Sequence, residues 1–290
     1  MEGKGTLYLC ATPIGNLEDM TYRAVRVLGE VAVIAAEDTR HTRKLLAHFD
    51  IHTPLVSYHE HNKLEQGPKL VERLLAGEDV AVVSDAGLPG IADPGAHLAQ
   101  LAIEAGCIVT PLPGANAALS ALICSGLDTT AFVFVGFLPK TAKKRRALLA
   151  ALAKEPRTML FYESPHRLRE MLRACCDVFG GGREAVAARE LTKKFEEFVR
   201  GDLARLCAHF DAVEPRGEFC LIVAGQAADA VQPAEEMLSP AQLVAQLVES
   251  GGLSKKEAIR EAAGRLRLGR RDVYRAVVEA EEKAQMKKEV

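Results

Sequence analysis

The sequence lacks any apolar run that approaches the roughly 20 residues needed to span a bilayer. Its first residues, Met1 to Gly5, also lack the basic start and apolar centre of a signal peptide. None of the seven cysteines belongs to a Cys-x-x-Cys pair, which argues against a zinc site and against a disulfide framework. We therefore expect a cytoplasmic protein with reduced, buried thiols and no membrane partner.

Several motifs that mark common enzyme classes are also missing. No Gly-x-x-x-x-Gly-Lys-Ser/Thr segment occurs, which disfavours P-loop phosphate transfer, and no Gly-x-Gly-x-x-Gly follows the first expected strand, which disfavours ordinary dinucleotide binding. No Gly-x-Ser-x-Gly elbow of a hydrolase is present. His59 and His61 supply two imidazoles without a clear third ligand, so we predict no metal site.

Composition and charge are those of a globular chain. Hydrophobic residues make up 48% of the sequence and charged residues 26%, which is enough apolar material for a sizeable core. The formal net charge is -2, so nothing global requires a nucleic-acid partner. Any such partner must be bound by local basic patches.

The first 125 residues alternate between short β-branched runs and amphipathic segments. The expected strands are 6–11, 31–36, 55–58, 79–83 and 107–111, and the expected helices are 21–28, 39–49, 62–76, 96–105 and 115–125. Such alternation is typical of an α/β domain whose parallel sheet is covered by helices on both faces. Right-handed crossovers then place the loops that follow the strands along one edge of the sheet.

A second α/β domain is expected over residues 126–225. Its strands are predicted at 131–136, 158–162, 185–189, 195–200 and 218–224, and its helices at 143–154, 165–179 and 202–210. Because some of these strands lie close together in sequence, we expect a mixed sheet, with a ligand cleft between the two domains. Residues 226–238 are interpreted as an acidic, alanine-rich linker, and residues 239–290 as a helical tail with helices 240–249, 254–268 and 270–283.

The stretch 84–95, Ser-Asp-Ala-Gly-Leu-Pro-Gly-Ile-Ala-Asp-Pro-Gly, joins an expected strand to an expected helix. Its glycines and prolines allow a ligand to lie directly against main-chain groups. The loops 12–16 and 111–116 also pair proline with glycine next to a helix start, where free N–H groups point outward. Three such loops at one edge predict a ligand-binding crevice rather than three tight turns.

Basic residues cluster in four places. From Lys255 to Arg275 eight basic residues stand against three acidic ones, in two expected helices joined at Leu268 and Gly269. This pattern fits either a helix-turn-helix-like nucleic-acid binder or a solvated helical hairpin. The other clusters are Arg40, Arg43 and Lys44; Lys140, Lys143, Lys144, Arg145 and Arg146; and His166, Arg167 and Arg169. Four clusters on a chain of net charge -2 favour an RNA track over solvated faces.

Six motifs, in order along about residues 5–225, resemble those of a known family. They are Thr12-Pro13-Ile14-Gly15-Asn16-Leu17, Ala36-Glu37-Asp38-Thr39-Arg40, Ser84-Asp85-Ala86-Gly87 with Ala92-Asp93-Pro94-Gly95, Pro113-Gly114-Ala115-Asn116, Phe161-Tyr162-Glu163-Ser164-Pro165-His166-Arg167 and Arg189-Glu190-Leu191-Thr192-Lys193. The chain is similar to the ribosomal RNA small subunit methyltransferase I family of the tetrapyrrole-methylase superfamily. The basic tail matches the extension that this family carries.

The resemblance implies two α/β domains of tetrapyrrole-methylase type with an interdomain cofactor cleft, a small C-terminal helical domain and a homodimer. It also implies methyl transfer from S-adenosylmethionine to the ribose 2′-hydroxyl of a cytidine in the 16S ribosomal RNA of the small ribosomal subunit. Superfamily enzymes that act on corrinoid rings tend to carry Gly-Asp-Pro where this chain has Ser84-Asp85-Ala86, and they lack the basic tail. A small-molecule methyltransferase of tetrapyrrole type and a non-catalytic ribosome- or RNA-binding protein are the alternatives.

The motifs and the basic clusters supply the expected site residues. Those expected to bind the cofactor are Pro13, Gly15, Ser84, Asp85, Ala86, Gly87, Asp93, Pro94, Gly95, Pro113, Gly114, Ala115, Asn116, Tyr162 and Glu163. Those expected to bind RNA are Arg40, Arg43, Lys44, Lys143, Lys144, Arg145, Arg146, Arg167, Lys255, Lys256, Arg270 and Arg271. Asp38, Glu190 and Lys193 are the predicted catalytic residues, because a positioned acceptor can activate a ribose hydroxyl. A structural salt bridge or helix cap is the alternative for each carboxylate.

Overall fold

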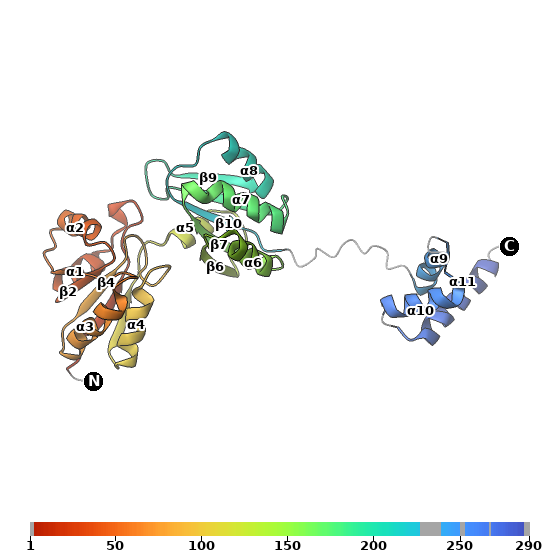
Figure 1. Ribbon diagram of the computed structural model, residues 1–290, viewed down its shortest axis with the longest axis horizontal. Helices are drawn as coiled ribbons and strands as arrows, with labels where there is room; N and C mark the ends of the chain where they lie inside the picture. The colour runs from red at the N-terminus through yellow and green to blue at the C-terminus, as the bar shows by residue number, and fades with distance from the viewer. Residues whose placement is uncertain (1–2, 227–238, 250–252, 267, 287–290) are drawn as a thin grey trace. The chain divides into compact units, whose positions relative to one another are not determined.

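The computed structural model describes residues 3–226, 239–249, 253–266 and 268–286 (Figure 1). The chain divides into two compact units, Met1–Gln226 and Ala227–Val290, each of which is described by itself. The first unit contains two five-stranded sheets covered by helices, and the second is helical. The α/β class that the sequence predicts is confirmed.

The first sheet is parallel throughout, with the strand order β3-β2-β4-β1-β5. Its strands are β1 (Thr6–Cys10), β2 (Val33–Ala36), β3 (Leu55–Ser57), β4 (Val80–Val83) and β5 (Ile108–Leu112). All four residues of β2 and all four of β4 are buried, as expected for short apolar runs at the centre of a sheet covered on both faces. The parallel arrangement brings the carboxyl end of every strand to one edge.

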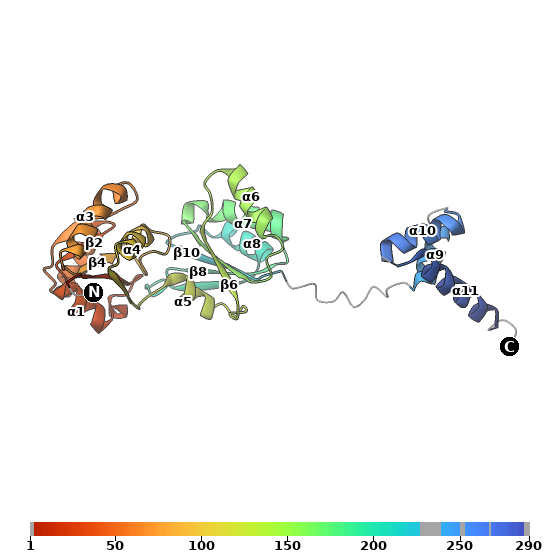
Figure 2. The same cartoon turned by 90° about the horizontal axis from the view of Figure 1, so that it is seen from below.

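Helices cover both faces of the first sheet. The α-helices of these layers are α1 (Tyr22–Glu30), α2 (Thr39–His48), α3 (Lys63–Leu75) and α4 (Gly95–Glu104), and a short 3₁₀ helix, η1 (Leu17–Asp19), precedes α1. Alternate residues of β2 divide between the two layers: Ile34 and Ala36 pack with α1 and α2, whereas Val33 and Ala35 pack with α3 and α4. Figure 2 shows α1 and α3 on opposite sides of the strands.

The second sheet is mixed, as the sequence predicts, with the order β6-β7-β10-β8-β9. Its strands are β6 (Phe132–Phe137), β7 (Thr158–Glu163), β8 (Glu184–Arg189), β9 (Glu197–Asp202) and β10 (Phe219–Val223). β6 runs parallel to β7, whereas β10 pairs antiparallel with both β7 and β8. One face of the sheet packs against α6 (Ala142–Leu152), α7 (Pro165–Phe179) and α8 (Leu203–Ala212).

The opposite face of the second sheet is covered by α5 (Ala117–Ile123). Ala118 and Leu122 of this helix pack with Leu160 of β7. The predicted boundary at residue 125 assigns this helix to the first domain, yet its buried side chains lie against the second sheet. Apolar spacing indicates that a helix has a buried face but does not indicate which sheet buries it. The division of the first unit into domains at residue 125 stays a proposal.

The strand expected at 195–200 begins two residues later, at Glu197. The preceding residues form a tight turn, because Thr192 N–H donates to Glu196 Oε2 at 2.6 Å and Glu196 N–H donates to Lys193 O at 3.1 Å. These polar contacts remove the segment from the β-ladder. Phe195, which favours a strand by propensity, is exposed as a result.

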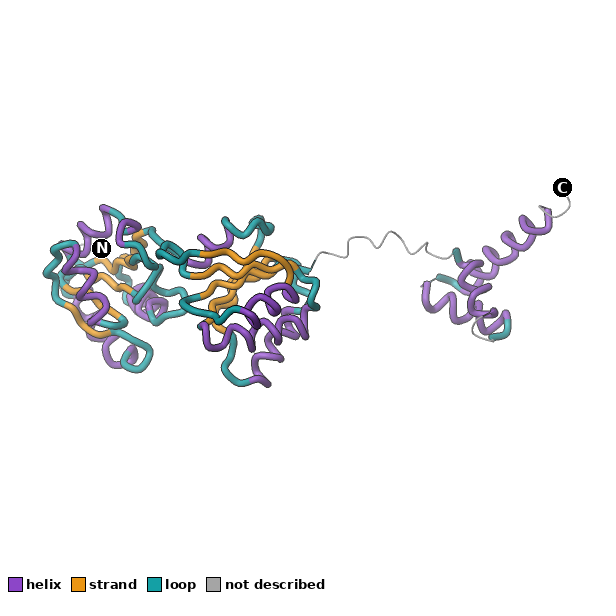
Figure 3. Tube along the Cα trace, turned by 90° about the horizontal axis from the view of Figure 1, so that it is seen from above, coloured by secondary structure: helices purple, strands orange, loops and turns teal. Residues whose placement is uncertain are grey.

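The described residues of the second unit form three packed helices with their own core. These are α9 (Pro240–Glu249), α10 (Lys255–Leu266) and α11 (Arg270–Met286), and Figure 3 shows helices and loops throughout the described residues of this unit. α9 packs against both other helices around Val244, Ala262 and Val273. The three helices expected in the tail are present. The predicted linker 226–238 lies, apart from Gln226, outside the described residues.

Candidate functional site

A cavity of about 410 Å³ is lined by residues of both sheets of the first unit. On the first sheet it lies at the carboxyl ends of β2, β4 and β5, where Glu37, Ser84 and Asn116 line it. On the second sheet Phe137 and Tyr162 line it from the ends of β6 and β7. The carboxyl edge of a parallel sheet is where open α/β folds bind ligands, so this cavity is the candidate site.

The structure places eight of the residues expected to bind the cofactor in the cavity wall: Ser84, Asp85, Ala86, Gly87, Asp93, Asn116, Tyr162 and Glu163. Pro13, Gly15, Pro94, Gly95, Pro113, Gly114 and Ala115 do not line it. Two of these glycines instead allow close packing. A Cβ on Gly114 would lie 2.7 Å from Ala11 Cβ, and a Cβ on Gly15 would lie 2.4 Å from Lys193 Cγ. Glycine spacing thus locates the loops but does not separate glycines that allow close packing from those that line the cavity.

The loop that follows β4 is held in place by backbone hydrogen bonds to Thr12, in the loop after β1, and by its own Asp93 side chain. Thr12 and Gly87 exchange two backbone hydrogen bonds, of 2.9 and 3.0 Å, and Gly87 adopts a φ of +82° that favours glycine. Asp93 Oδ1 accepts hydrogen bonds from the N–H groups of Gly90 at 2.7 Å and Gly95 at 2.8 Å. A ligand therefore meets a main-chain surface that is already fixed.

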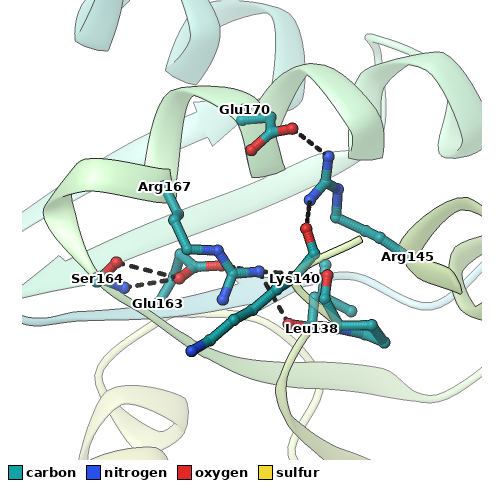
Figure 4. A network of polar contacts seen from close by, with 8 residues as sticks. Leu138, Lys140, Arg145, Glu163, Ser164, Arg167 and Glu170 are labelled. Atoms are coloured by element: carbon teal, nitrogen blue, oxygen red, sulfur yellow. Dashed lines mark hydrogen bonds and ion pairs between the residues drawn. The ribbon is translucent and has the colours of Figure 1, made fainter. Parts of the chain in front are cut away.

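Glu163 ends β7 with a fully buried side chain in the cavity wall (Figure 4). Its Oε1 accepts a hydrogen bond from Ser164 N–H at 2.8 Å, and its Oε2 lies 3.5 Å from Arg167 Nη2 in an ion pair. Within the described part of the chain, Oε2 accepts no hydrogen bond. A buried carboxylate oxygen is costly without a donor, so Oε2 is the natural acceptor for a donor group of a ligand.

Carboxylates set the charge of the cavity. Glu37, Asp85, Asp93, Glu163 and Glu218 line it, whereas no lysine or arginine of the described residues does. Burial raises the pKa of the Glu37 carboxyl, and the negative charge of Asp85 adds to the rise. Arg167 offsets the charge of Glu163, and Lys193 offsets that of Glu218. The remaining carboxylates keep the wall acidic, which favours a positively charged ligand and disfavours phosphate groups.

Asp38, a predicted catalytic residue, does not line the cavity. It caps the N-terminus of α2, where its Oδ1 accepts from Arg40 N–H at 2.8 Å and its Oδ2 lies 2.7 Å from Arg40 Nη2. Hydrogen bonds from the Arg40 side chain and backbone hold the pKa of Asp38 well below its usual range. The geometry favours the helix-cap alternative. Sequence reasoning missed the neighbouring Glu37, although successive residues at a strand end point to opposite sides.

Glu190 and Lys193 lie beside the cavity without lining it. Lys193 Nζ donates to Glu190 Oε1 at 3.0 Å and to Glu218 Oε2 at 3.2 Å. Burial raises the pKa of Glu190, but the hydrogen bonds from Lys193 and from Glu218 N–H outweigh it and leave the pKa lowered. Glu190 and Thr192 hold φ angles of +51° and +64°, a strained turn that seats Leu191 in the cavity wall. These contacts favour a structural salt bridge between Glu190 and Lys193 over a catalytic role for either residue.

Arg145 and Arg167 were expected to bind RNA, and the structure engages both in contacts within the first unit. Arg145 is buried, pairs with Glu170 and shares the inner face of α6 with Leu149, four residues on. Arg167 Nη2 donates to Leu138 O at 2.8 Å (Figure 4). A run of basic residues in sequence does not reveal that one of them turns inward at helical spacing.

Arg145→Met is therefore expected to lower the free energy of unfolding by about 1–3 kcal/mol, because it removes a buried charged hydrogen-bond donor. Chemical denaturation measures the effect. Arg146→Met, at an exposed position on the same helix, is the matched control and should leave stability unchanged. An Arg145→Met protein of full stability would contradict this placement.

The other basic residues expected to bind RNA are accessible. Arg40, Arg43, Lys44, Lys143, Lys144 and Arg146 are exposed. Lys255, Lys256, Arg270 and Arg271 line a groove of about 700 Å³ in the second unit. Arg260 and Tyr274, which sequence reasoning did not select, line the same groove. An exposed aromatic ring among cations is a feature of surfaces that bind single-stranded nucleic acid.

Three expectations about residue chemistry concern metals, membranes and thiols. The described residues contain no group of three or more His, Cys, Asp or Glu side chains placed to hold a metal ion. Nor does any helix in the described ranges have the length and hydropathy of a membrane span.

Cys10, Cys107, Cys175 and Cys220 are buried, whereas Cys124 is exposed at the C-terminal end of α5. Burial of the thiols was thus predicted wrongly for Cys124.

Residues 6–207 match the family model described as Tetrapyrrole (Corrin/Porphyrin) Methylases. The chain is 51% identical over 276 residues to a protein of Halalkalibacterium halodurans, and the match covers 94% of each chain. It is 49% identical over 275 residues to a protein of Bacillus subtilis (strain 168), again over 94% of each chain. Both relatives are named ribosomal RNA small subunit methyltransferase I.

Solved structures share the fold of the first unit. Uroporphyrin-III C-methyltransferase from Thermus thermophilus, in complex with S-adenosyl homocysteine, gives a TM-score of 0.55 at 19% identity and covers 77% of this chain and 98% of its own. A diphthine synthase gives 0.57 at 15% identity and covers 77% of this chain and 90% of its own. At these identities the structures show the fold alone. The family match and the relatives show that the chain belongs to the tetrapyrrole (corrin/porphyrin) methylases and, among them, to the ribosomal RNA small subunit methyltransferase I family.

Proposed function

We propose that this chain transfers a methyl group from S-adenosylmethionine to the ribose 2′-hydroxyl of a cytidine in the 16S RNA of the small ribosomal subunit. The names of the relatives support an RNA substrate. The observation that carries the proposal is the separation of charge within the first unit. Carboxylates line the cavity, whereas exposed lysines and arginines lie outside it. The first surface suits a cationic cofactor, and the second suits the phosphates of RNA.

The polar groups of the cavity fit S-adenosylmethionine, whose sulfonium and amino groups carry positive charge. Glu163 Oε2 is a buried acceptor for a donor group, and the main chain of Ser84 to Gly87 and the Asn116 side chain supply further polar contacts. The bound cofactor supplies an electrophilic methyl group. The fixed loop after β4 orients it and excludes water, and such positioning can contribute roughly 7–11 kcal/mol to a displacement reaction.

A ribose hydroxyl loses its proton as it is methylated, so a nearby acceptor accelerates the transfer. We assign this role to Glu37 rather than to Asp38, because Glu37 lines the cavity and Asp38 does not. The raised pKa of Glu37 makes it a stronger base than an ordinary carboxylate. A positioned general base contributes about 10²- to 10⁴-fold in rate.

The groove of the second unit is proposed to bind phosphates of the same RNA. Replacing Lys256, Arg260, Arg270 and Arg271 by alanine should raise KM for small-subunit particles and leave kcat at saturation nearly unchanged, because the lost contacts bind substrate and transition state alike. The slope of log affinity against log salt should become shallower by about 3, because each of the four lost phosphate contacts contributes about 0.7–0.9 to it. Filter binding across a salt series measures the slope.

A matched control replaces Lys69, Arg73, Arg157 and Arg216, each of which pairs with an acidic side chain of the first unit. This variant should keep both KM and the salt slope. Equal losses in the two variants would mean that the groove has no special part in binding. An unchanged slope in the groove variant would favour the solvated hairpin.

One experiment separates the proposed class from its two alternatives. Calorimetric titration with S-adenosylmethionine is followed by transfer of a labelled methyl group to 30S subunits or to a free tetrapyrrole. We expect cofactor binding and label in 16S RNA. Label in the tetrapyrrole alone would identify a small-molecule enzyme, and cofactor binding without transfer would identify a non-catalytic RNA-binding protein.

We further propose that the chain is a cytoplasmic homodimer, as its ribosomal substrate and its family suggest. Ile103, Ile108 and Ile123 are exposed by 63%, 48% and 73%, which provides apolar surface for a second copy. Sedimentation equilibrium should give the mass of two chains. The mass of a single chain at micromolar concentration would contradict the dimer.

A further inference from the structure

The loop that follows β6 is fastened through its backbone by two arginines. Arg167 Nη2 donates to Leu138 O at 2.8 Å and to Pro139 O at 3.4 Å, and Arg145 Nη1 donates to Lys140 O at 3.4 Å. Figure 4 shows both guanidinium groups converging on this loop. Three consecutive carbonyl groups are thus held in place.

Each guanidinium is in turn anchored by a carboxylate on the other side. Arg145 pairs with Glu170 of α7, and Arg167 pairs with Glu163 at the cavity wall. The loop therefore connects directly to the residue that we assign to the cofactor. Rigid support of this kind is needed where a surface must present groups in a fixed position.

The end of β6 turns Phe137 toward the cavity. The pairing of β6 with β7 shifts register between Phe134 and Gly136, and Gly136 has a φ of +69°. Such bulges re-aim the following side chain. Phe137 lines the cavity, is 56% exposed, and its ring centroid lies 5.6 Å from that of Tyr162. The Phe137 ring therefore lines the cavity while more than half of the residue stays exposed to solvent.

Lys140 follows three residues later in the same loop and is exposed. Its ammonium group makes no ion pair or hydrogen bond with the described residues, and Figure 4 shows its side chain extending away from Arg145 and Glu170. Lys143, Lys144 and Arg146 continue the positive charge along α6. An exposed ring that is followed within ten residues by exposed cations offers the two groups that an unpaired nucleotide needs, a stacking face for the base and a countercharge for the phosphate.

The charge of the cavity fixes how a nucleotide would approach. Its carboxylates admit a neutral ribose but repel phosphate, so the phosphates must stay at the rim. We propose that Phe137 and Lys140 form a nucleotide-docking site at this rim, where the ring stacks on an unpaired base and the ammonium group pairs with a backbone phosphate. The inference rests on the proposed RNA methylation and names the groups that present the target nucleotide.

The test compares Phe137→Ala, Phe137→Trp and Lys140→Ala with the wild-type chain on 30S subunits. Loss of stacking in Phe137→Ala should raise KM by about tenfold or more, and Phe137→Trp should restore it. Lys140→Ala, a surface change that cannot disturb packing, should reduce the salt slope of binding by about 0.7. The affinity for S-adenosylmethionine, measured by calorimetry, should stay unchanged in all three.

Phe195→Ala is the matched control, because Phe195 is 63% exposed but does not line the cavity. It should keep the wild-type KM. A wild-type KM in Phe137→Ala, or an unchanged salt slope in Lys140→Ala, would overturn the docking site while leaving RNA methylation intact. A lowered cofactor affinity in Phe137→Ala would assign the ring to the cofactor instead. Failure of the wild-type chain to methylate RNA is a separate result and would overturn the proposed function itself.

Discussion

Glu37→Gln is expected to lower kcat by about 10²- to 10⁴-fold, the usual contribution of a positioned general base. The affinity for S-adenosylmethionine should change far less, because four other carboxylates, among them Glu163, remain in the cavity wall. Glutamine keeps the size of the side chain but cannot take the proton of the ribose hydroxyl. Single-turnover methyl transfer at saturating cofactor measures the effect without product release.

The neighbouring residue provides the control. Asp38→Asn changes the adjacent carboxylate to its amide, and asparagine caps a helix as well as aspartate does. Because Asp38 lies outside the cavity, this variant should keep nearly all of the wild-type kcat. A large loss in Asp38→Asn, together with a small loss in Glu37→Gln, would return the acceptor role to Asp38.

The pH dependence of kcat provides a second readout. Burial raises the pKa of Glu37, the charges of Asp85 and Asp93 add to the rise, and a backbone hydrogen bond from Asp85 and the charge of His59 oppose it. A base must be deprotonated to act, so kcat should fall as the pH drops through this raised pKa. The fall should begin at a higher pH than the ordinary glutamate value of about 4.3 predicts, and it should be absent in Glu37→Gln.

Glu163→Gln is expected to weaken the binding of S-adenosylmethionine by about 10- to 100-fold. A hydrogen bond to a charged group is worth about 1.5–3 kcal/mol, and removal of the charge loses most of it. Glutamine also removes the negative charge that pairs with Arg167 Nη2, 3.5 Å from Oε2. In the described residues Oε2 accepts no hydrogen bond, so its acceptor capacity is the part that a bound cofactor would use. Calorimetric titration with the cofactor measures the loss.

Glu170→Gln is the matched control for this prediction. Glu170 lies on α7, is exposed, and keeps a hydrogen-bond acceptor for Arg145 when it is changed to the amide. Its variant should bind the cofactor with wild-type affinity. A folded Glu163→Gln protein with wild-type affinity would remove Glu163 from the cofactor site.

The sequence predicts the fold well because its signals are local. Alternation of β-branched runs with amphipathic segments locates every strand and helix of the first unit within a few residues, apart from the short η1, and the spacing of β8 and β9 indicates the mixed sheet. The packing of α5 against the second sheet was not predictable, because its pattern is the same whichever sheet buries it.

The site is predictable only in outline. Glycine and proline mark the loops, yet Gly15 and Gly114 serve packing while Gly87 faces the cavity. Adjacent residues also differ in role: Glu37 lines the cavity, whereas Asp38 caps helix α2. Arg145 turns inward from a run of exposed cations. Each of these outcomes depends on which side of a strand end or helix faces the interior, and neither residue type nor spacing fixes that.

The most direct test of the proposed function identifies the atom that receives the methyl group. Wild-type protein is incubated with labelled S-adenosylmethionine and 30S subunits, the 16S RNA is digested to nucleosides, and the labelled nucleoside is identified by mass spectrometry. We expect 2′-O-methylcytidine, with the label greatly reduced for Glu37→Gln and retained for Asp38→Asn. Label on a base, or the same yield of 2′-O-methylcytidine from the wild-type and Glu37→Gln proteins, would contradict it.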